Sequence, residues 1–209
     1  MRDATDSGCT VFIVDDDEPM RDSLALMLGL LLGYRAASFA SAEAFLAAYQ
    51  DNWTGCLVAD LKLPGKNGIE LQAELRARGS QLPFVIITAH GGVSSARAAF
   101  QADAVDFLEK PFDEADLRAA IEKGLAQELG RLQRAAADSE NALKLAKLTR
   151  REREVLQLAG KGLHAKEIAR TLGISPRTVE VHKASVMGKL GARNVAELVR
   201  FAMTAEKHA

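Results

Sequence analysis

Short apolar runs alternate with amphipathic stretches between residues 9 and 126, and this alternation most narrowly limits the fold. The expected strands are 11–14, 36–39, 56–59, 84–88 and 105–108. The expected helices are 18–32, 41–49, 67–78, 93–102 and 113–126. Such alternation is typical of an open parallel sheet with helices on both faces. Because crossovers are right-handed, we predict an α/β, flavodoxin-like (βα)5 domain at 9–126 with the parallel sheet order 2-1-3-4-5.

The helical pattern that begins near Asp113 continues well beyond this domain. Residues 113–147 contain no proline and are rich in Ala, Leu, Glu and Lys. Gly124 and Gly130 weaken a helix there by roughly 1 kcal/mol each relative to alanine. We therefore predict a helical linker at 127–147, with a break near 138–139 as the alternative.

Residues 148–209 show helix-capping patterns and no strand pattern. Thr149 and Glu152 form a capping box, and Ser175 followed by proline is typical of a helix start. The expected helices begin at 149, 164, 175 and 194, and the last one ends near 203. The pattern predicts a small all-α, four-helix domain at 148–209.

The charges of the 209 residues are divided unequally along the chain. Residues 148–209 carry 12 Lys and Arg against 6 Asp and Glu, a net charge of +6, whereas residues 1–147 carry a net charge of −7. Opposite signs indicate two domains with different partners, and the basic domain is a candidate for binding nucleic acid.

The sequence indicates neither a membrane protein nor a secreted one. The longest apolar stretch, 24–32, is too short to span a bilayer, and MRDATDSG at the N-terminus lacks the apolar core of a signal peptide. Cys9 and Cys56 belong to no CxxC pair and form no disulfide framework. We therefore expect a reduced, cytoplasmic protein with no membrane partner.

Carboxylates follow two strands that the predicted order makes neighbours. Asp15 and Asp16 end the first strand, and Asp60 ends the third. Binding sites of such sheets lie at the carboxyl ends of the strands, so three carboxylates should converge, with no cation close enough to neutralise all three. A hard divalent ion bound by oxygens would relieve their repulsion, and Mg²⁺ accepts a partial set of carboxylates. The sequence therefore predicts a Mg²⁺ site.

The remaining strand ends supply groups that suit phosphoryl transfer. Thr88 ends the fourth strand with a hydroxyl, and the fifth strand leads into Lys110, whose ammonium suits phosphate oxygens. Pro111 follows, so the bond before it can be cis. With Mg²⁺ and a central aspartate, these groups predict phosphoryl transfer to a carboxylate.

Four segments of this half resemble the receiver domain of two-component response regulators: VDDDEP, DLKLPGKNG, TAH and FLEKPF. The resemblance implies that Asp60 is the phosphoacceptor. It also implies roles for the other residues: Asp16 as a direct Mg²⁺ ligand, Asp15 as a ligand through water, the Lys62 backbone carbonyl as a further ligand, Thr88 and Lys110 as phosphoryl-binding groups, and Thr88 and Phe107 as switch residues.

The basic half contains a second recognisable arrangement. KEIARTLG followed by ISPRTVEVHKASVMGKL is typical of a helix–turn–helix, whose second helix enters the major groove of DNA. This helix starts with Ser-Pro and presents donors to phosphates at its N-terminus and along one side, and its N-terminal dipole adds to their effect. Together with LTRREREVLQLAGKG, these segments resemble the LuxR-type DNA-binding domain. The whole chain resembles response regulators of the FixJ/NarL family and lies nearest the FixJ branch.

This second resemblance implies individual DNA contacts. Expected contacts to the DNA backbone come from Lys166, Arg177, Thr178 and Lys189. Residues expected to face the bases are Glu180, Val181, Lys183 and Ala184. Glutamate can accept from a cytosine amino group, and small apolar side chains can touch a thymine methyl. The apolar residues Ile168, Leu172, Val179 and Met187 are expected in the core.

The family implies a transcriptional regulator rather than an enzyme. A sensor histidine kinase would phosphorylate Asp60 with Mg²⁺, and phosphorylation would promote a homodimer through the fourth helix and fifth strand of the sheet domain. The dimer would bind double-stranded promoter DNA, with RNA polymerase as a further partner. One alternative is a regulator whose receiver dimerises regardless of phosphorylation. A Mg²⁺-dependent aspartyl-phosphate phosphatase is disfavoured, because Lys62 stands where such enzymes carry a second aspartate.

The segment GGVSSARAAFQAD at 91–103 departs from the usual sequence of the FixJ branch. Asp103 stands where a glycine normally closes the fourth helix, although aspartate tolerates a left-handed backbone better than most residues. Gly91 and Gly92 are expected to form a mobile loop rather than a nucleotide-binding motif. The departure concerns the expected dimer surface and leaves the acidic residues unaffected.

Overall fold

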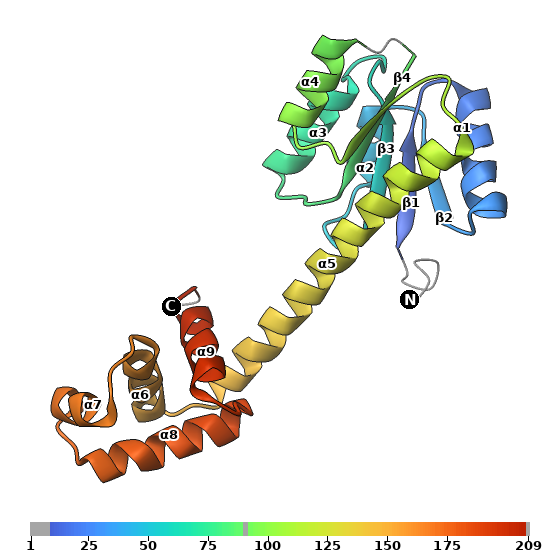
Figure 1. Ribbon diagram of the computed structural model, residues 1–209. Coiled ribbons are helices and arrows are strands. Elements are labelled where there is room, and N and C mark those ends of the chain that lie inside the picture. The colour runs from blue at the N-terminus through green and yellow to red at the C-terminus, as the bar shows by residue number, and fades with distance from the viewer. Residues whose placement is uncertain (1–8, 90–91, 208–209) are drawn as a thin grey trace. The chain divides into compact units, whose positions relative to one another are not determined.

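A computed structural model describes residues 9–89 and 92–207 (Figure 1). The chain divides into two compact units, Met1–Arg131 and Leu132–Ala209, which are described separately below. Two of the sequence-based expectations fall outside the described residues: the absence of a signal peptide at 1–8 and the mobile loop at Gly91. His90 of the TAH motif also lies outside them.

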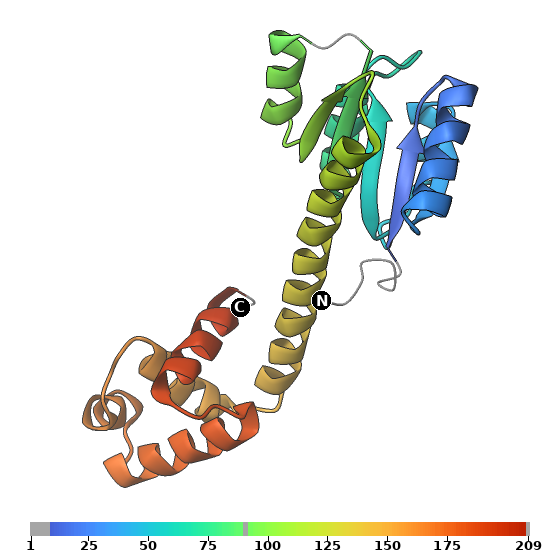
Figure 2. The ribbon, with the colours of Figure 1, turned by 45° about the vertical axis from the view of Figure 1, so that its right-hand side comes forward.

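The first unit contains the predicted five-stranded parallel sheet, with the order β2-β1-β3-β4-β5 (Figure 2). Its strands are β1 Thr10–Val14, β2 Arg35–Phe39, β3 Gly55–Asp60, β4 Phe84–Thr88 and β5 Asp106–Glu109. Its helices are α1 Glu18–Leu26, the π-helical turn η2 Met27–Leu31, α2 Ala42–Ala48, α3 Gly68–Ala77, α4 Val93–Gln101 and α5 Glu114–Ala146. The flavodoxin-like fold is confirmed. The expected helix at 18–32 is α-helical only in its first part.

Two apolar cores cover the two faces of this sheet. Successive residues of a strand point to opposite faces, so Val11 and Ile13 pack with α1 and α5 on one side. Phe12 and Val14 pack with α2 and α3 on the other side. Burial on both faces explains why the strands appear in the sequence as nearly continuous apolar runs.

Helix α5 extends without interruption through the expected linker, so the alternative of a break near 138–139 is wrong. Its start packs closely on β3, because a Cβ atom on Gly124 would lie 2.6 Å from Cys56 Sγ. Burial, and to a lesser extent the charge of Glu128, raises the pKa of the Cys56 thiol to about 12. Buried Glu128 forms an ion pair with Arg131 Nε at 2.7 Å. That ion pair lies within α5 itself, whereas apolar side chains such as Leu117, Ile121 and Leu125 pack the first part of α5 against the sheet.

The second unit is the predicted four-helix domain, preceded by the end of α5. Its helices are α6 Arg150–Gly160, α7 Ala165–Leu172, α8 Pro176–Leu190 and α9 Val195–Lys207. Thr149 and Glu152 form the expected capping box, and Ser175 caps α8 by accepting from the Thr178 N–H. Helix α9 ends at Lys207, beyond the expected end near 203. Among the described residues, no helix is long and apolar enough to cross a membrane.

Candidate phosphoryl and DNA sites

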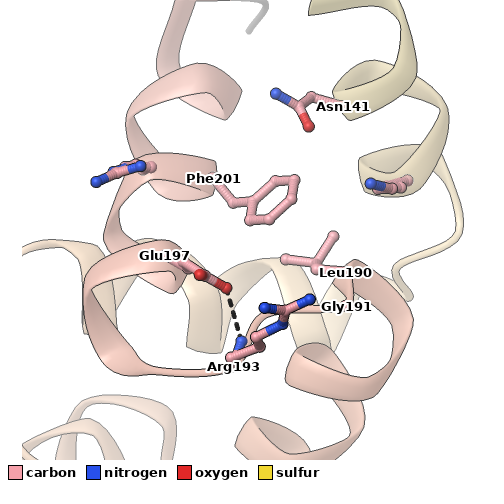
Figure 3. A pocket seen from close by; sticks show the side chains of 8 residues that line it. Asn141, Leu190, Gly191, Arg193, Glu197 and Phe201 are labelled. Atoms are coloured by element: carbon pink, nitrogen blue, oxygen red, sulfur yellow. Dashed lines mark hydrogen bonds between the residues drawn. The ribbon is translucent and has the colours of Figure 1, made fainter. Parts of the chain in front are cut away.

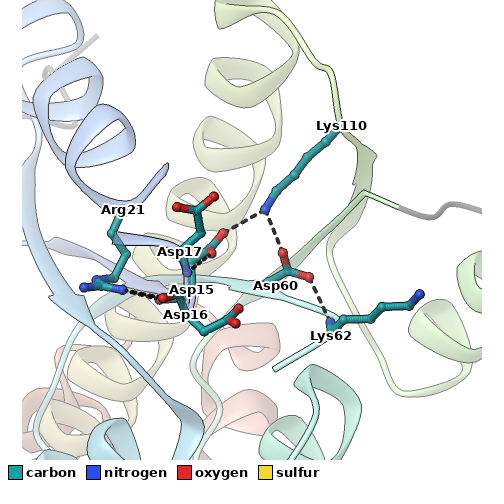
Figure 4. Close-up of polar contacts among 7 residues, drawn as sticks. All are labelled: Asp15, Asp16, Asp17, Arg21, Asp60, Lys62 and Lys110. Carbon is teal, nitrogen blue, oxygen red and sulfur yellow. Dashed lines mark hydrogen bonds and ion pairs between the residues drawn. The ribbon is translucent and has the colours of Figure 1, made fainter. Parts of the chain in front are cut away.

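The predicted acidic site lies at the carboxyl end of the sheet (Figure 4). Asp15 follows β1 and Asp60 ends β3, and these strands pair directly. The Asp15 and Asp60 residues are only 1% and 7% exposed, whereas Asp16 is exposed. Thr88, at the end of β4, is fully buried. The fold thus gathers side chains that are far apart in the sequence at one edge of the sheet.

Lys110 joins the two buried carboxylates. Its Nζ lies 2.8 Å from Asp15 Oδ2 and 2.6 Å from Asp60 Oδ2. This single ammonium pairs with two of the three carboxylates, and Asp16 is not among them, which agrees with the expectation that no cation neutralises all three. Burial acts to lower the pKa of Lys110, but its hydrogen bonds to the two carboxylates outweigh burial and raise that pKa. The Lys110–Pro111 bond is cis, as the sequence allowed.

Backbone N–H groups hold the other oxygen of each buried carboxylate. The Asp17 N–H donates to Asp15 Oδ1 at 2.9 Å, and the Lys62 N–H donates to Asp60 Oδ1 at 2.8 Å. The Arg21 guanidinium donates to the Asp15 carbonyl at 2.8 Å and to the Asp16 carbonyl at 3.1 Å (Figure 4). Both acid-bearing loops are therefore fixed, and the orientation of each carboxylate is set before any ligand arrives.

The carboxylates of Asp15, Asp16 and Asp60 suit a hard cation, although their side chains do not form a complete metal-binding site as placed. Within 9–89 and 92–207, no group of three or more His, Cys, Asp or Glu side chains could hold a metal ion as placed. Asp15 and Asp60 supply buried carboxylate oxygens, and exposed Asp16 supplies a third carboxylate beside them. Carboxylate oxygens are the ligands that Mg²⁺ prefers, so the residues fit this ion.

The two expected switch residues lie on neighbouring strands. Thr88 ends β4, and Phe107 in β5 is half-buried against the core that includes α2 and α3. The Lys110 N–H donates to the Thr88 carbonyl at 2.7 Å, so these two residues share one backbone contact.

The segment that departs from the usual family sequence forms α4 and its C-terminal turn. Asp103 has φ 61°, so it takes the left-handed conformation expected of the missing glycine. Phe100 on the same helix is 52% exposed. This leaves an apolar side chain on the surface where the dimer contact is expected.

Glu43 is a positioning residue that the sequence did not reveal. It stands in α2, yet its carboxylate accepts from the Lys66 N–H at 2.9 Å in the loop that follows Asp60. Gly65 in that loop has φ 77°, and a Cβ atom there would lie 2.6 Å from Glu43 Oε1. The contact spans two elements, so no local motif predicts it.

The helix–turn–helix consists of α7 and α8. Exposed residues that were expected to contact DNA are Lys166, Arg177, Glu180, Val181 and Ala184, whereas Thr178 and Lys183 are half-buried. Val181 is 62% exposed, so its side chain is accessible on the surface of α8. The residues expected in the core, Ile168, Leu172, Val179 and Met187, all belong to the apolar core of this unit.

Lys189, an exposed residue that was expected to contact phosphate, also forms an ion pair within its own domain. Its Nζ lies 2.7 Å from Oε2 of Glu152, and Glu152 is only 4% exposed. Ser185 also donates to this carboxylate, at 2.7 Å. Bonds from Lys189, then Ser185, then the Thr149 N–H lower the pKa of Glu152 to about 2. Lys189 therefore pairs α8 with α6 inside the domain.

We expect Glu152→Gln to lower the free energy of unfolding of this unit by about 2 kcal/mol at pH 7. Because the folded state depresses the pKa of Glu152, its contribution is full above pH 4.5 and is lost as the pH falls towards 2. Urea unfolding followed by circular dichroism at several pH values measures this. Glu154→Gln, on the same helix, is the control and should change stability much less. An equal loss of unfolding free energy in Glu152→Gln and Glu154→Gln would contradict the stabilising role assigned to the buried Glu152 carboxylate.

The fold and the two sites define a response regulator with a receiver domain and a helix–turn–helix domain. Residues 11–122 match the family described as response regulator receiver domain, and residues 146–202 match the luxR family of bacterial regulatory proteins. The chain belongs to the two-component response regulators that join a receiver to a LuxR-type DNA-binding domain.

Relatives along nearly the whole chain are transcriptional regulators rather than enzymes. The chain is 44% identical to the transcriptional regulatory protein FixJ of Azorhizobium caulinodans, over 93% of this chain and 92% of that protein. It is 46% identical to FixJ of Rhizobium meliloti, over 93% and 95% of the two chains. Among solved structures, the response regulator StyR is 41% identical, with a TM-score of 0.78 over 95% of this chain and 98% of that one.

Proposed function

We propose that this chain is a transcriptional response regulator that a sensor histidine kinase phosphorylates on Asp60 in the presence of Mg²⁺. One observation carries the proposal: the buried Asp60 carboxylate is held by the Lys62 N–H on one oxygen and by Lys110 on the other. A carboxylate oriented in this way, with an ammonium at 2.6 Å, suits attack on a phosphorus atom. Phosphorylation then promotes dimerisation and promoter binding.

The transfer step follows from the groups at the site. An oxygen of Asp60 attacks the phosphorus of phosphohistidine; the new P–O bond forms as the P–N bond breaks, and the imidazole leaves. Asp15, Asp16, Asp60 and the Lys62 carbonyl would hold Mg²⁺, which supplies neutralisation of the charge on the phosphoryl oxygens. Lys110 donates to a phosphoryl oxygen, and the Thr88 hydroxyl donates to another.

Phosphorylation adds a charge of about −2 at the carboxyl end of β3. We propose that Thr88 moves towards the phosphoryl group and that half-buried Phe107 then moves fully into the core. These movements bias the surface of α4 and β5 towards a dimer. Exposed Phe100 supports this placement, because a self-associating surface needs apolar side chains.

A dimer through this surface should depend on Phe100. We expect Phe100→Glu to shift the phosphorylated protein from dimer to monomer, because each copy would bring a like charge into the interface. Sedimentation velocity with a phosphodonor and Mg²⁺ measures this. Leu143→Glu, which changes an exposed apolar residue outside α4 and β5, is the control and should leave the dimer intact. Equal dimerisation of the Phe100 variant and wild type would place the interface elsewhere.

We further propose that α8 enters the major groove of promoter DNA, with RNA polymerase as a partner of the bound dimer. Ser175 and Pro176 begin α8, so exposed Arg177 lies in the first turn of the helix and can face the phosphates. Val181 is exposed on the same helix and can contact a thymine methyl. The net charge of +6 over residues 148–209 supports binding to a polyanion.

Arg177→Ala should weaken DNA binding by about tenfold, because a charge-assisted bond to phosphate is lost. The slope of log affinity against log salt should fall in magnitude by about 1, whatever the DNA sequence. Fluorescence anisotropy at several salt concentrations measures both values. Arg150→Ala removes a side chain that is 96% exposed on α6 and should change neither. An unchanged salt slope in Arg177→Ala would remove this residue from the DNA surface.

A further inference from the structure

A cavity of about 340 Å³ lies in the second unit, between the end of α5 and the segment that joins α8 to α9 (Figure 3). This volume is at the lower end of the range for small-molecule sites. Leu190 and Phe201 form an apolar part of its wall, and Asn141 points towards Phe201 from the opposite side (Figure 3). None of these residues is expected to contact DNA, so the cavity is separate from the helix–turn–helix surface.

The lining carries an excess of positive charge. Lys144, Arg193 and Arg200 contribute three cations, and Glu197 contributes one carboxylate. The Glu197 carboxylate accepts from the Arg193 backbone N–H at 2.7 Å, so it is directed towards the start of α9 (Figure 3). Among the residues that the structure describes, no carboxylate forms an ion pair with the Arg193 guanidinium. Glu140, which pairs with Lys144, adds a second carboxylate beside the cavity, so three cations face two carboxylates and the excess is one positive charge next to an apolar wall.

Lys144 brings the charge and the aromatic ring together. Its Nζ lies 6.0 Å from the centre of the Phe201 ring and 2.7 Å from Glu140 Oε1. A ligand anion could share this ammonium with Glu140, while its apolar body lies against Phe201 and Leu190. A cavity of this size has room for one aromatic ring with an anionic group.

We propose that this cavity binds a small aromatic anion, such as an aryl carboxylate or aryl phosphonate, between α5 and α9. The anionic group lies between Lys144 and Arg193, and the ring packs on Phe201. Lys144 belongs to α5, Arg193 lies just before α9, and Phe201 lies in α9. A ligand bound by all three would therefore connect the end of α5 to the helical domain. Binding of such an anion would thus affect how firmly the end of α5 is held against the four helices of this domain.

Titration of the full-length protein with phenylphosphonate tests the proposal. Amide shifts in ¹⁵N-labelled protein should change saturably for residues of α9 and the end of α5. Arg193→Gln and Lys144→Gln should each weaken binding by about tenfold, as expected for the loss of one charge-assisted bond. Arg150→Gln removes an exposed charge outside the cavity and should leave the affinity unchanged. Benzyl alcohol and inorganic phosphate, which lack one half of the ligand, should each bind more weakly.

Three results would overturn the proposal. The first is the absence of saturable shifts with phenylphosphonate and with benzoate. The second is equal affinity for wild type, Lys144→Gln and Arg193→Gln, which would place the ligand elsewhere. The third is equal binding of inorganic phosphate and phenylphosphonate, which would show a general anion effect without a role for Phe201.

Discussion

Asp60→Asn should take up no phosphoryl group under conditions in which the wild-type protein gains one. The amide is too weak a nucleophile to replace the carboxylate, although it has nearly the same shape. Its oxygen can still accept from the Lys62 N–H, so the loop after β3 should keep its conformation. Intact-protein mass spectrometry after incubation with a small phosphodonor and Mg²⁺ measures the outcome directly.

The matched control for this experiment is Asp51→Asn, which changes an exposed aspartate of the same unit. This variant should gain one phosphoryl group, like the wild type. A phosphoryl group on the Asp60→Asn protein would place the acceptor elsewhere. If even the wild type gained none with a competent donor, the receiver would act as a dimerisation module without phosphorylation.

Lys110→Met should lower the free energy of unfolding by about 3 kcal/mol at neutral pH in the absence of Mg²⁺. The ammonium lies within 2.8 Å of Asp15 and 2.6 Å of Asp60, and both carboxylates are buried. Methionine fills much of the same volume but leaves two like charges without their cation. Urea unfolding of the receiver can be followed by the fluorescence of its one tryptophan, Trp53, which stacks on Phe12.

Mg²⁺ should restore more stability to Lys110→Met than to the wild type, because it would replace the missing positive charge and binds the folded state. Lys62→Met is the matched control, since its side chain points away from the carboxylates (Figure 4). It should leave the stability and the Mg²⁺ response close to those of the wild type. Equal stability of all three proteins without Mg²⁺ would contradict the role assigned to Lys110.

The sheet could be predicted from the sequence because its strands are buried on both faces. Continuous apolar runs marked β1 and β4 within about one residue, and the polar residues that follow them marked the site. Helix starts were equally clear where side chains cap them, as at Thr149 and Ser175. These features are local, so neighbouring residues suffice to reveal them.

Contacts between distant segments could not be predicted in the same way. Lys110 was expected to bind a phosphoryl group, but its bridge between two carboxylates depends on side-chain reach across three strands. The ion pair of Lys189 with Glu152 was not predicted, because nothing near Lys189 in the sequence shows that Glu152 lies opposite. Asp138 and Ser139 suggested a break in α5 from their low helix propensity, yet the surrounding helix-forming residues outweigh two weak positions.

The central claim is that phosphorylation of Asp60 controls DNA binding. The most direct measurement is the affinity of the full-length protein, at one fixed salt concentration, for a duplex selected by the phosphorylated protein from random sequences. We expect phosphodonor and Mg²⁺ to raise the affinity of the wild type by about tenfold or more, together with dimerisation, and to leave Asp60→Asn unchanged. Equal affinity and equal oligomeric state of the wild type with and without phosphorylation would contradict the claim.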